Sequence, residues 1–250
     1  LTSATIQSNQ SGDWGCSTTL LGGVLPTLNS DVIIKTGHTI TQTTTNAVCT
    51  SITIEAGAIF QRNSSNLSLR LYMKKNFINN GIATNLFFDL RYSTGSIITS
   101  TSPVNLAGYY QPGKVVTIAS GTTISESAGR FYAQAGAIIN NNGSMLLKTL
   151  NYTSSPLMTF NNLSGGVLTL STDVRSGLNV NFTSSTNSTV NLEKAVTSIP
   201  NWTYHHLNLN GSVSTKTVSA LAAALLVNGD LAISAGVTLN INSKDLSLAG

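Results

Sequence analysis

The chain has 250 residues, of which 9% are charged, and its formal net charge is +4. An ordinary soluble domain carries roughly 25% charged residues. Polarity comes here from serine, threonine and asparagine, which together number 91. The basic residues form no stripe with aromatic residues, and no apolar run approaches the ~18 residues of a membrane span, so we expect no nucleic-acid binding and no span. We associate this composition with stacked strands and with an extracellular protein.

The first 30 residues show no sustained strand periodicity. We expect residues 1–30 to form an N-terminal cap, with Trp14 as a capping residue. A stack of coils needs such a cap because its end otherwise exposes apolar side chains and unpaired strand edges.

Two lines of sequence, residues 31–42 and 51–61, repeat at an offset of 20 residues. The alignment pairs Val32 with Ile52, Ile34 with Ile54, Gly37 with Gly57, and Ile40 with Phe60. Each line reads as a short strand, a glycine corner and a second short strand, which is typical of one coil of a β-solenoid. The same offset places Lys35 against Glu55 as a stacked ion pair.

The glycine pattern recurs along the chain. Six copies carry the glycine, at Gly37, Gly57, Gly95, Gly121, Gly136 and Gly236. We interpret these glycines as sharp corners with a positive φ, and the Asn-Gly steps at Gly81, Gly143 and Gly211 as corners of the same chemistry. The Ala-rich segment Val218–Leu226 could form a helix, but its β-type flanks favour a strand.

The sequence therefore predicts an all-β fold, a single-stranded parallel β-helix over residues 31–250. Because the strand pattern runs up to the last residues, we expect the chain to be the N-terminal piece of something longer and its coils to continue.

Several motifs in one order carry a family resemblance. They are Ser11-Gly-Asp-Trp14, Gly22-Gly-Val-Leu-Pro26, Asp31-Val-Ile-Ile34, Gly37-His-Thr-Ile-Thr41, and the later runs Leu207–Gly211 and Leu226–Leu239. They resemble Bacteroidetes cell-surface parallel β-helix proteins over about the first 60 and the last 45 residues. More distantly, the chain resembles the eight-glycine domain of some animal ectodomain proteins.

The resemblance implies a right-handed β-helix exported by type IX secretion, with the secretion machinery as a partner during export. It further implies a secreted or cell-surface location and a role in a large adhesin, for attachment or gliding motility. The ligand would be a surface glycan or another extracellular molecule.

The chain has two cysteines, Cys16 and Cys49. In an exported protein two cysteines suggest one disulfide, here tying the cap to the first coils; the alternative is a pair of free buried thiols. Closing this loop would contribute on the order of 3–4 kcal/mol in the chain-entropy model.

Aromatic residues form loose clusters, which are Phe87 and Phe88 with Tyr92, Tyr109 with Tyr110, Phe131 with Tyr132, and Trp202 with Tyr204. Stacked aromatic rings can bind sugar faces, and Tyr109, Tyr110, Trp202 and Tyr204 are the predicted glycan-stacking residues. The alternative for each is packing in the core, because side chains alternate between the two faces of a strand.

Catalysis and metal binding are weakly supported. The chain has nine acidic residues and no two lie within five positions, whereas polysaccharide lyases and hydrolases need clustered carboxylates. His38 is assigned a structural role, and His205 and His206 would point to opposite faces of a regular strand, so we expect no metal or cofactor. We predict a non-enzymatic module; the alternatives are a carbohydrate-active β-helix enzyme and a purely structural stalk.

Overall fold

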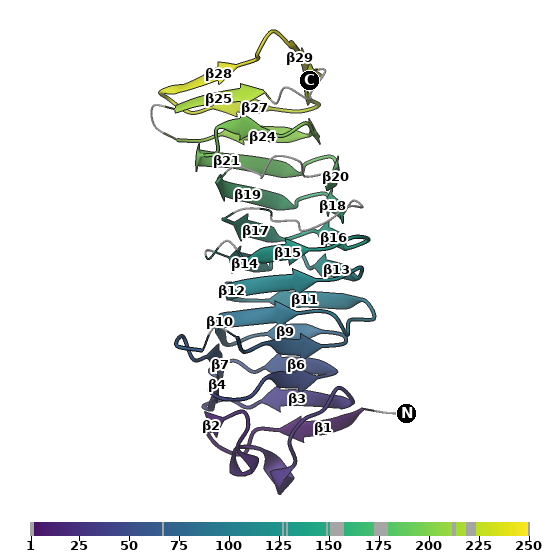
Figure 1. Ribbon diagram of the computed structural model, residues 1–250, viewed down its shortest axis with the longest axis vertical. Helices are drawn as coiled ribbons and strands as arrows, with labels where there is room; N and C mark the ends of the chain where they lie inside the picture. Colours follow the sequence, from purple (N-terminus) through teal and green to yellow (C-terminus); the bar gives the residue numbers. More distant parts are fainter. Residues whose placement is uncertain are drawn as a thin grey trace.

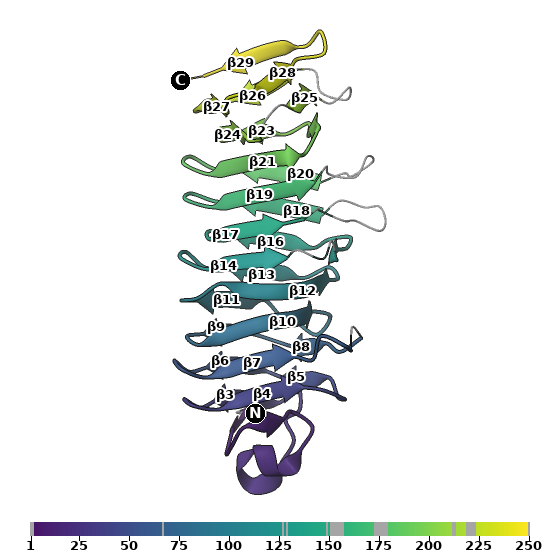
Figure 2. The ribbon, with the colours of Figure 1, turned by 90° about the vertical axis from the view of Figure 1, so that its left-hand side faces the viewer.

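The computed structural model describes residues 3–66, 68–126, 128, 130–148, 150, 158–172, 180–211, 214–218 and 224–249. The chain winds into an elongated solenoid of about ten turns, with the N-terminus at one end and the C-terminus at the other (Figures 1 and 2). Its described strands pair in parallel with strands of the preceding and following coils. The predicted parallel β-helix is confirmed.

The strands form two long sheets and two short ones. The nine-stranded sheet contains, in spatial order, β1 (Ala4–Gln7), β3 (Ser30–Ile34), β6 (Ser51–Ile54), β9 (Phe77–Asn79), β11 (Ser96–Ser100), β13 (Val115–Ile118), β16 (Ile138–Asn141), β18 (Met158–Asn162) and β20 (Val180–Ser184). The main path of the fourteen-stranded sheet is β2 (Gly12–Asp13), β4 (Thr39–Gln42), β7 (Ile59–Arg62), β10 (Ile82–Asp89), β12 (Val104–Gln111), β14 (Thr123–Glu126), β17 (Ser144–Leu147), β19 (Val167–Thr172), β21 (Thr189–Ala195), β24 (His206–Leu209) and β27 (Leu231–Ile233).

Three strands of the fourteen-stranded sheet lie off this path. They are β5 (Ala47–Cys49), β8 (Leu71–Met73) and β15 (Phe131–Ala133); β8 pairs with β5 and β10, and β15 pairs with β12. The two short sheets are β22 (Ser198–Ile199), β25 (Ser214–Val218) and β28 (Val237–Asn240), and β23 (Thr203–Tyr204), β26 (Ala224–Val227) and β29 (Asp245–Leu248). The described ends of the Ala-rich segment are thus strands, as predicted, and residues 219–223 lie outside the described residues. No helix among the described residues is long and apolar enough to cross a membrane.

The 20-residue offset is the actual register of the first coils. Val32 pairs with Ile52 and Ile40 with Phe60, and the side chains of all four are buried. The Nζ atom of Lys35 lies 2.6 Å from Oε1 of Glu55, which confirms the predicted ion pair.

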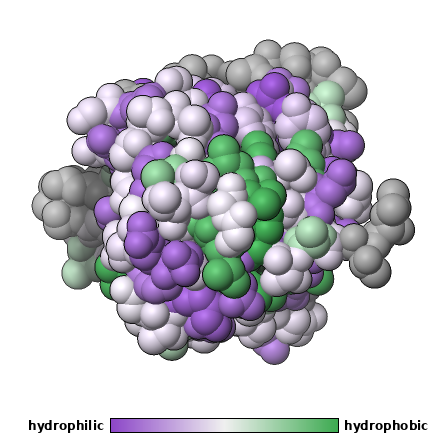
Figure 3. All heavy atoms as spheres, turned by 90° about the horizontal axis from the view of Figure 1, so that it is seen from below, coloured by the Kyte–Doolittle hydropathy of each residue, from purple (hydrophilic) through white to green (hydrophobic). Residues whose placement is uncertain are grey.

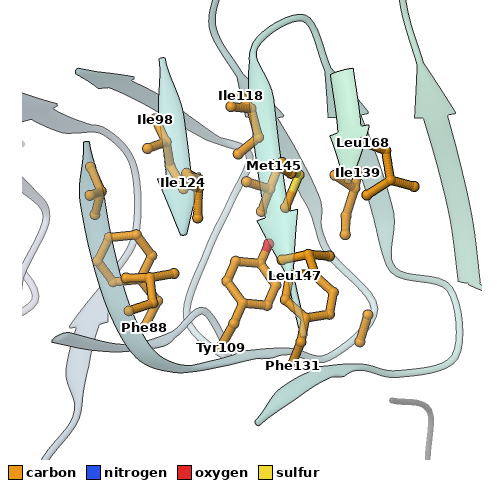
Figure 4. Packing of buried hydrophobic residues seen from close by; sticks show 14 of the residues in the cluster. Phe88, Ile98, Tyr109, Ile118, Ile124, Phe131, Ile139, Met145, Leu147 and Leu168 are labelled. Carbon is orange, nitrogen blue, oxygen red and sulfur yellow. The ribbon is translucent and has the colours of Figure 1, made fainter. Parts of the chain in front are cut away.

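The core consists of inward side chains that stack in columns from coil to coil. Figure 4 shows one such column, in which Phe88, Tyr109 and Phe131 follow one another on neighbouring strands. Each fully buried side chain of this size stabilises the fold by roughly 1.5–3 kcal/mol relative to an exposed one. Because every coil adds the same inward positions, the core is continuous along the solenoid.

Asparagine side chains form ladders on both faces of the nine-stranded sheet. Inside, Asn141 donates from Nδ2 to Oδ1 of Asn162 at 2.9 Å; outside, Asn161 donates to Oδ1 of Asn140 at 2.8 Å. The buried ladder satisfies polar groups that would otherwise cost free energy in the core.

The predicted glycine corners are confirmed. All six of the repeated glycines have φ between 72° and 112°. The interpretation of Gly81 and Gly143 as corners of the same kind is wrong, because neither has a positive φ. They form shorter corners, in which the side chain of Asn79 or Asn141 accepts the N–H of the glycine two positions later at 3.2 Å.

Glycine is needed at the short corners for close approach. A Cβ atom on Gly81 would collide with the backbone oxygens of Ala58 and Glu55, whereas one on Gly37 would meet nothing within 4 Å. The two corner types therefore select glycine for different physical reasons.

The first part of the predicted cap is a coil of the solenoid. β1 pairs with β3 and β2 pairs with β4, so each long sheet gains a strand before the 20-residue repeat begins. Trp14 is 3% exposed and packs on Phe60 at a centroid distance of 5.5 Å, so it belongs to the core at this end of the stack.

Beyond Trp14, two short 3-10 turns, η1 (Ser17–Thr19) and η2 (Leu21–Gly23), close this end of the stack. Leu21, Val24 and Leu25 remain exposed there, and Figure 3 shows hydrophobic side chains gathered at the centre of the end that these turns cover.

The difference between the corner types gives a stability prediction. Gly37→Ala should lower the free energy of unfolding by about 1–2 kcal/mol, the cost of a left-handed alanine. Gly81→Ala should lower it by roughly 3 kcal/mol or more, because backbone atoms must move. Urea-induced unfolding followed by circular dichroism measures both, and an equal loss in the two variants would contradict the assignment of Gly81 to a close-approach corner.

Candidate functional site

Tyr109 and Tyr110, two of the predicted glycan-stacking residues, lie on opposite sides of the wall. Tyr109 is fully buried, stacks on Phe131 at a centroid distance of 4.4 Å and an angle of 6°, and donates its hydroxyl to Gln111 (Figure 4). Tyr110 is half-buried and faces outward. The strand alternation therefore assigns Tyr109 to the core and leaves Tyr110 as a surface residue.

The other two predicted glycan-stacking residues also belong to the core. Tyr204 is fully buried and donates its hydroxyl to the backbone oxygen of Pro200 at 2.8 Å. Trp202 is 9% exposed and stacks on Phe182 at a centroid distance of 4.3 Å. Neither ring offers a free face to a sugar, so the prediction is wrong for Tyr109, Trp202 and Tyr204.

A row of outward tyrosines runs along the ladder formed by β8, the C-terminal half of β10, the C-terminal half of β12, and β15. Its consecutive rungs are Tyr72, Asp89, Tyr110 and Tyr132. Tyr92, which is 45% exposed, meets the ring of Tyr72 edge-on at 5.7 Å. We call Tyr72, Tyr92, Tyr110 and Tyr132 the tyrosine strip.

A buried carboxylate lies in the middle of the tyrosine strip. Asp89 is 1% exposed and accepts two hydrogen bonds from the guanidinium of Arg91, Nε to Oδ1 at 2.9 Å and Nη2 to Oδ2 at 2.8 Å, and a third from its backbone N–H at 3.3 Å. The guanidinium carbon lies 5.3 Å from the ring centroid of Tyr72 and 5.6 Å from that of Tyr110. The hydrogen bonds to Asp89 raise the pKa of the Arg91 guanidinium.

This pair holds the strip in a fixed arrangement. A bidentate arginine–carboxylate contact fixes both side chains, and the arginine in turn fills the space between two tyrosine rings. The strip is therefore organised before any ligand arrives, which lowers the ordering cost of binding.

The chemistry of the strip is complementary to a linear, amphipathic ligand. Each tyrosine presents an apolar ring face and a hydroxyl that donates and accepts hydrogen bonds. Neighbouring rungs are about 4.8 Å apart, so the row from Tyr72 to Tyr132 spans about 14 Å along the solenoid axis. A saccharide chain, with apolar ring faces edged by hydroxyl groups, matches this pattern.

Sequence reasoning found Tyr110 but missed Tyr72, Tyr92 and Tyr132. A signal for two of them exists, because Tyr72, Tyr110 and Tyr132 each stand between two inward residues in the triplets Leu71-Tyr-Met73, Tyr109-Tyr-Gln111 and Phe131-Tyr-Ala133. That these triplets are stacked is visible only in the register, since their spacing in sequence is irregular.

The predicted disulfide is wrong. Cys49 is fully buried in β5, where it alternates inward together with Ala47, while Cys16 is exposed in the turn that leads into η1. Both thiols are free. Burial raises the pKa of Cys49, and a hydrogen bond to Thr18 lowers the pKa of Cys16.

The histidines hold loops and coils together. Nδ1 of His38 lies 2.7 Å from the hydroxyl of Ser8, which links the first coil to the second. His205 lies at a bend between β23 and β24, so the expectation of opposite faces is wrong: the two rings meet edge-on at 4.3 Å.

The ring nitrogens of the pair have separate partners. Nδ1 of His205 accepts the N–H of Asn187 at 3.3 Å, and Nδ1 of His206 lies 3.1 Å from both the amide nitrogen and Oδ2 of Asp230. Within the described residues, no three His, Cys, Asp or Glu side chains gather in a way that could hold a metal ion.

Comparison of the chain with family models, with curated proteins and with solved structures finds no match.

The free cysteines give a direct test. In the native protein a maleimide should modify Cys16 and leave Cys49 unmodified, because only a solvent-accessible thiolate reacts. In denaturant without reductant both should be modified, and intact mass measures the count. A denatured, unreduced protein that takes up no label would show that the two thiols are bridged.

Proposed function

We propose that the protein is a non-enzymatic carbohydrate-binding module of an extracellular bacterial adhesin. The observation that carries the proposal is the tyrosine strip, a preorganised row of outward rings on consecutive coils. Its ligand is a glycan chain that lies along the solenoid axis.

The strip suits binding better than catalysis. Its one carboxylate, Asp89, is 1% exposed and both of its oxygens accept hydrogen bonds from Arg91, so neither oxygen is open to a substrate. Paired acid and base chemistry on a sugar requires two carboxyl groups on either side of the scissile bond. The rings of the strip supply contact area and orientation only.

The surrounding architecture supports an adhesin. An elongated solenoid with a sparsely charged, Ser/Thr/Asn-rich surface carries its binding residues away from an attachment point, and the loops of such a solenoid present one face to a partner. The motif resemblance to type IX-secreted cell-surface proteins supports export by that route, with the secretion machinery as a transient partner. Attachment or gliding motility is the cellular role that this resemblance supports.

A glycan array with the purified protein tests the proposal. Tyr110→Ala and Tyr132→Ala should each weaken binding of the best-bound glycan roughly tenfold, because each removes one aromatic contact of the strip. Tyr110→Phe should retain most of the affinity if the ring face carries it.

Leu146→Ala is the matched control, since Leu146 is an outward apolar residue of β17, 40% exposed and away from the strip. It should leave glycan binding unchanged. Binding that survives both tyrosine-to-alanine substitutions, or the release of shorter saccharides from a bound polysaccharide, would contradict the proposal.

A further inference from the structure

A cleft of about 460 Å³ lies in the outer wall beside the tyrosine strip. Its lining residues are Arg62, Thr84, Asn85, Asn105, Leu106, Ala107, Ala128 and Arg130. The floor belongs to β10 and β12, which run on for eight residues each. In the coils on either side the strand is interrupted, between β7 and β8 and between β14 and β15. Arg62 at the end of β7 lines one wall, and Ala128 and Arg130 between β14 and β15 line the other.

Arg62 is fixed in one wall by an unusual turn of the floor strand. Asn85 has φ 57°, and the register of β10 against β12 shifts next to it. The backbone oxygen of Asn85 accepts from Nε of Arg62 at 2.8 Å, its side-chain oxygen accepts from Nη2 at 3.2 Å, and Asn66 accepts from Nη1 at 3.0 Å. These partners hold the guanidinium but leave its charge uncompensated, since all are neutral oxygens.

Positive charge accumulates around this guanidinium. Arg130 lines the facing wall, and its side chain forms no ion pair or hydrogen bond with the described residues. Burial lowers the pKa of Arg62, and repulsion from Arg130 and Arg70 lowers it further.

No acidic residue lines the cleft. Glu126 is the acid closest in sequence to the Arg130 wall, but it is 1% exposed and its Oε1 accepts the backbone N–H groups of Ala128 at 2.8 Å and Arg130 at 3.1 Å. Asp89 is held by Arg91. Like charges held together at a partly desolvated surface favour an anion as the missing partner.

We propose that this cleft binds an oxyanion, a carboxylate or sulfate group borne by the saccharide chain that the tyrosine strip holds. The proposal rests on the carbohydrate-binding function and specifies the ligand as an acidic polysaccharide. Arg62 and Arg130 supply planar guanidinium donors for the oxyanion, and the outward Asn105 supplies an amide donor from the floor.

The cleft and the strip are joined by one strand. Both Asn105 and Tyr110 are outward residues of β12, five residues apart, which corresponds to about 16 Å. A side branch of the chain that stacks on the tyrosines can therefore run along β12, across the solenoid axis, and place a charged group between the arginines.

Two measurements test the proposal. In the first, dextran sulfate and polygalacturonate are titrated into the protein at several salt concentrations, with neutral dextran as the uncharged counterpart. In the second, inorganic sulfate is titrated while the Nε–H signal of Arg62 is followed by NMR, which reports on the cleft without any saccharide. Arg130→Gln removes one wall of the cleft, and Lys244→Gln is the control for the same change of net charge at the far end of the solenoid.

The proposal expects tighter binding of an acidic polysaccharide than of dextran, weakening with salt, and a sulfate-dependent shift of the Arg62 signal. Arg130→Gln should weaken binding of the acidic polysaccharide by about tenfold or more and abolish the sulfate-dependent shift of the Arg62 signal. It should leave binding of dextran unchanged. Lys244→Gln should change none of these, and circular dichroism checks that both variants are folded.

Failure of this proposal is distinguishable from failure of the carbohydrate-binding function. A sulfate shift without preference for acidic over neutral polysaccharide would overturn the saccharide-borne anion and leave glycan binding intact. A sulfate shift with no polysaccharide bound at all would overturn both. No sulfate shift, or equal losses in Arg130→Gln and Lys244→Gln, would overturn the oxyanion site itself.

Discussion

The structure depends on the backbone hydrogen bonds that join each coil to the coils before and after it. The ladders between the described strands are parallel and keep their register outside the shifts in β10–β12 and β19–β21. Where the register is kept, a residue that faces inward in one coil is followed by inward residues in the neighbouring coils. Val32, Ile52 and Phe77, which pair in successive coils and all face inward, are an example. A change in coil length is tolerated only where a corner or an interruption between strands absorbs it.

The corners show how the sequence meets this constraint. Where a coil turns over several residues, as at Gly37 and Gly57, a glycine with positive φ makes the bend. Where the turn is shorter, as at Gly81 and Gly143, an asparagine side chain replaces a missing backbone hydrogen bond and the glycine makes room for the coil below. Both solutions keep the strands in register, and both are needed because the coils differ in length.

The repeat, the ion pair of Lys35 and Glu55 and the six positive-φ glycine corners could be predicted because they depend on spacing within one or two coils. The tyrosines could not be sorted in the same way. Tyr109 and Tyr110 are adjacent, so one must face inward, but which one depends on the shifted register of β12 against β10. The surroundings of Asp89 could not be predicted either. The arginine that covers Asp89 lies between the rings of Tyr72 and Tyr110, which belong to two other coils. The predicted disulfide is wrong because the spacing of Cys16 and Cys49 in the sequence does not give the direction in which each side chain points.

The candidate sites arise where the solenoid is least regular. β10 and β12 are continuous where the strands of the neighbouring coils are broken into two. These two long strands form the floor of the cleft and carry the middle of the tyrosine strip. Gly108 makes the passage possible, because a Cβ atom there would collide with the ring of Phe87. That ring is 3% exposed and lies 3.5 Å beneath the guanidinium of Arg70, between cleft and strip. The irregular register at this point thus positions an arginine, an aromatic ring and two outward surfaces together.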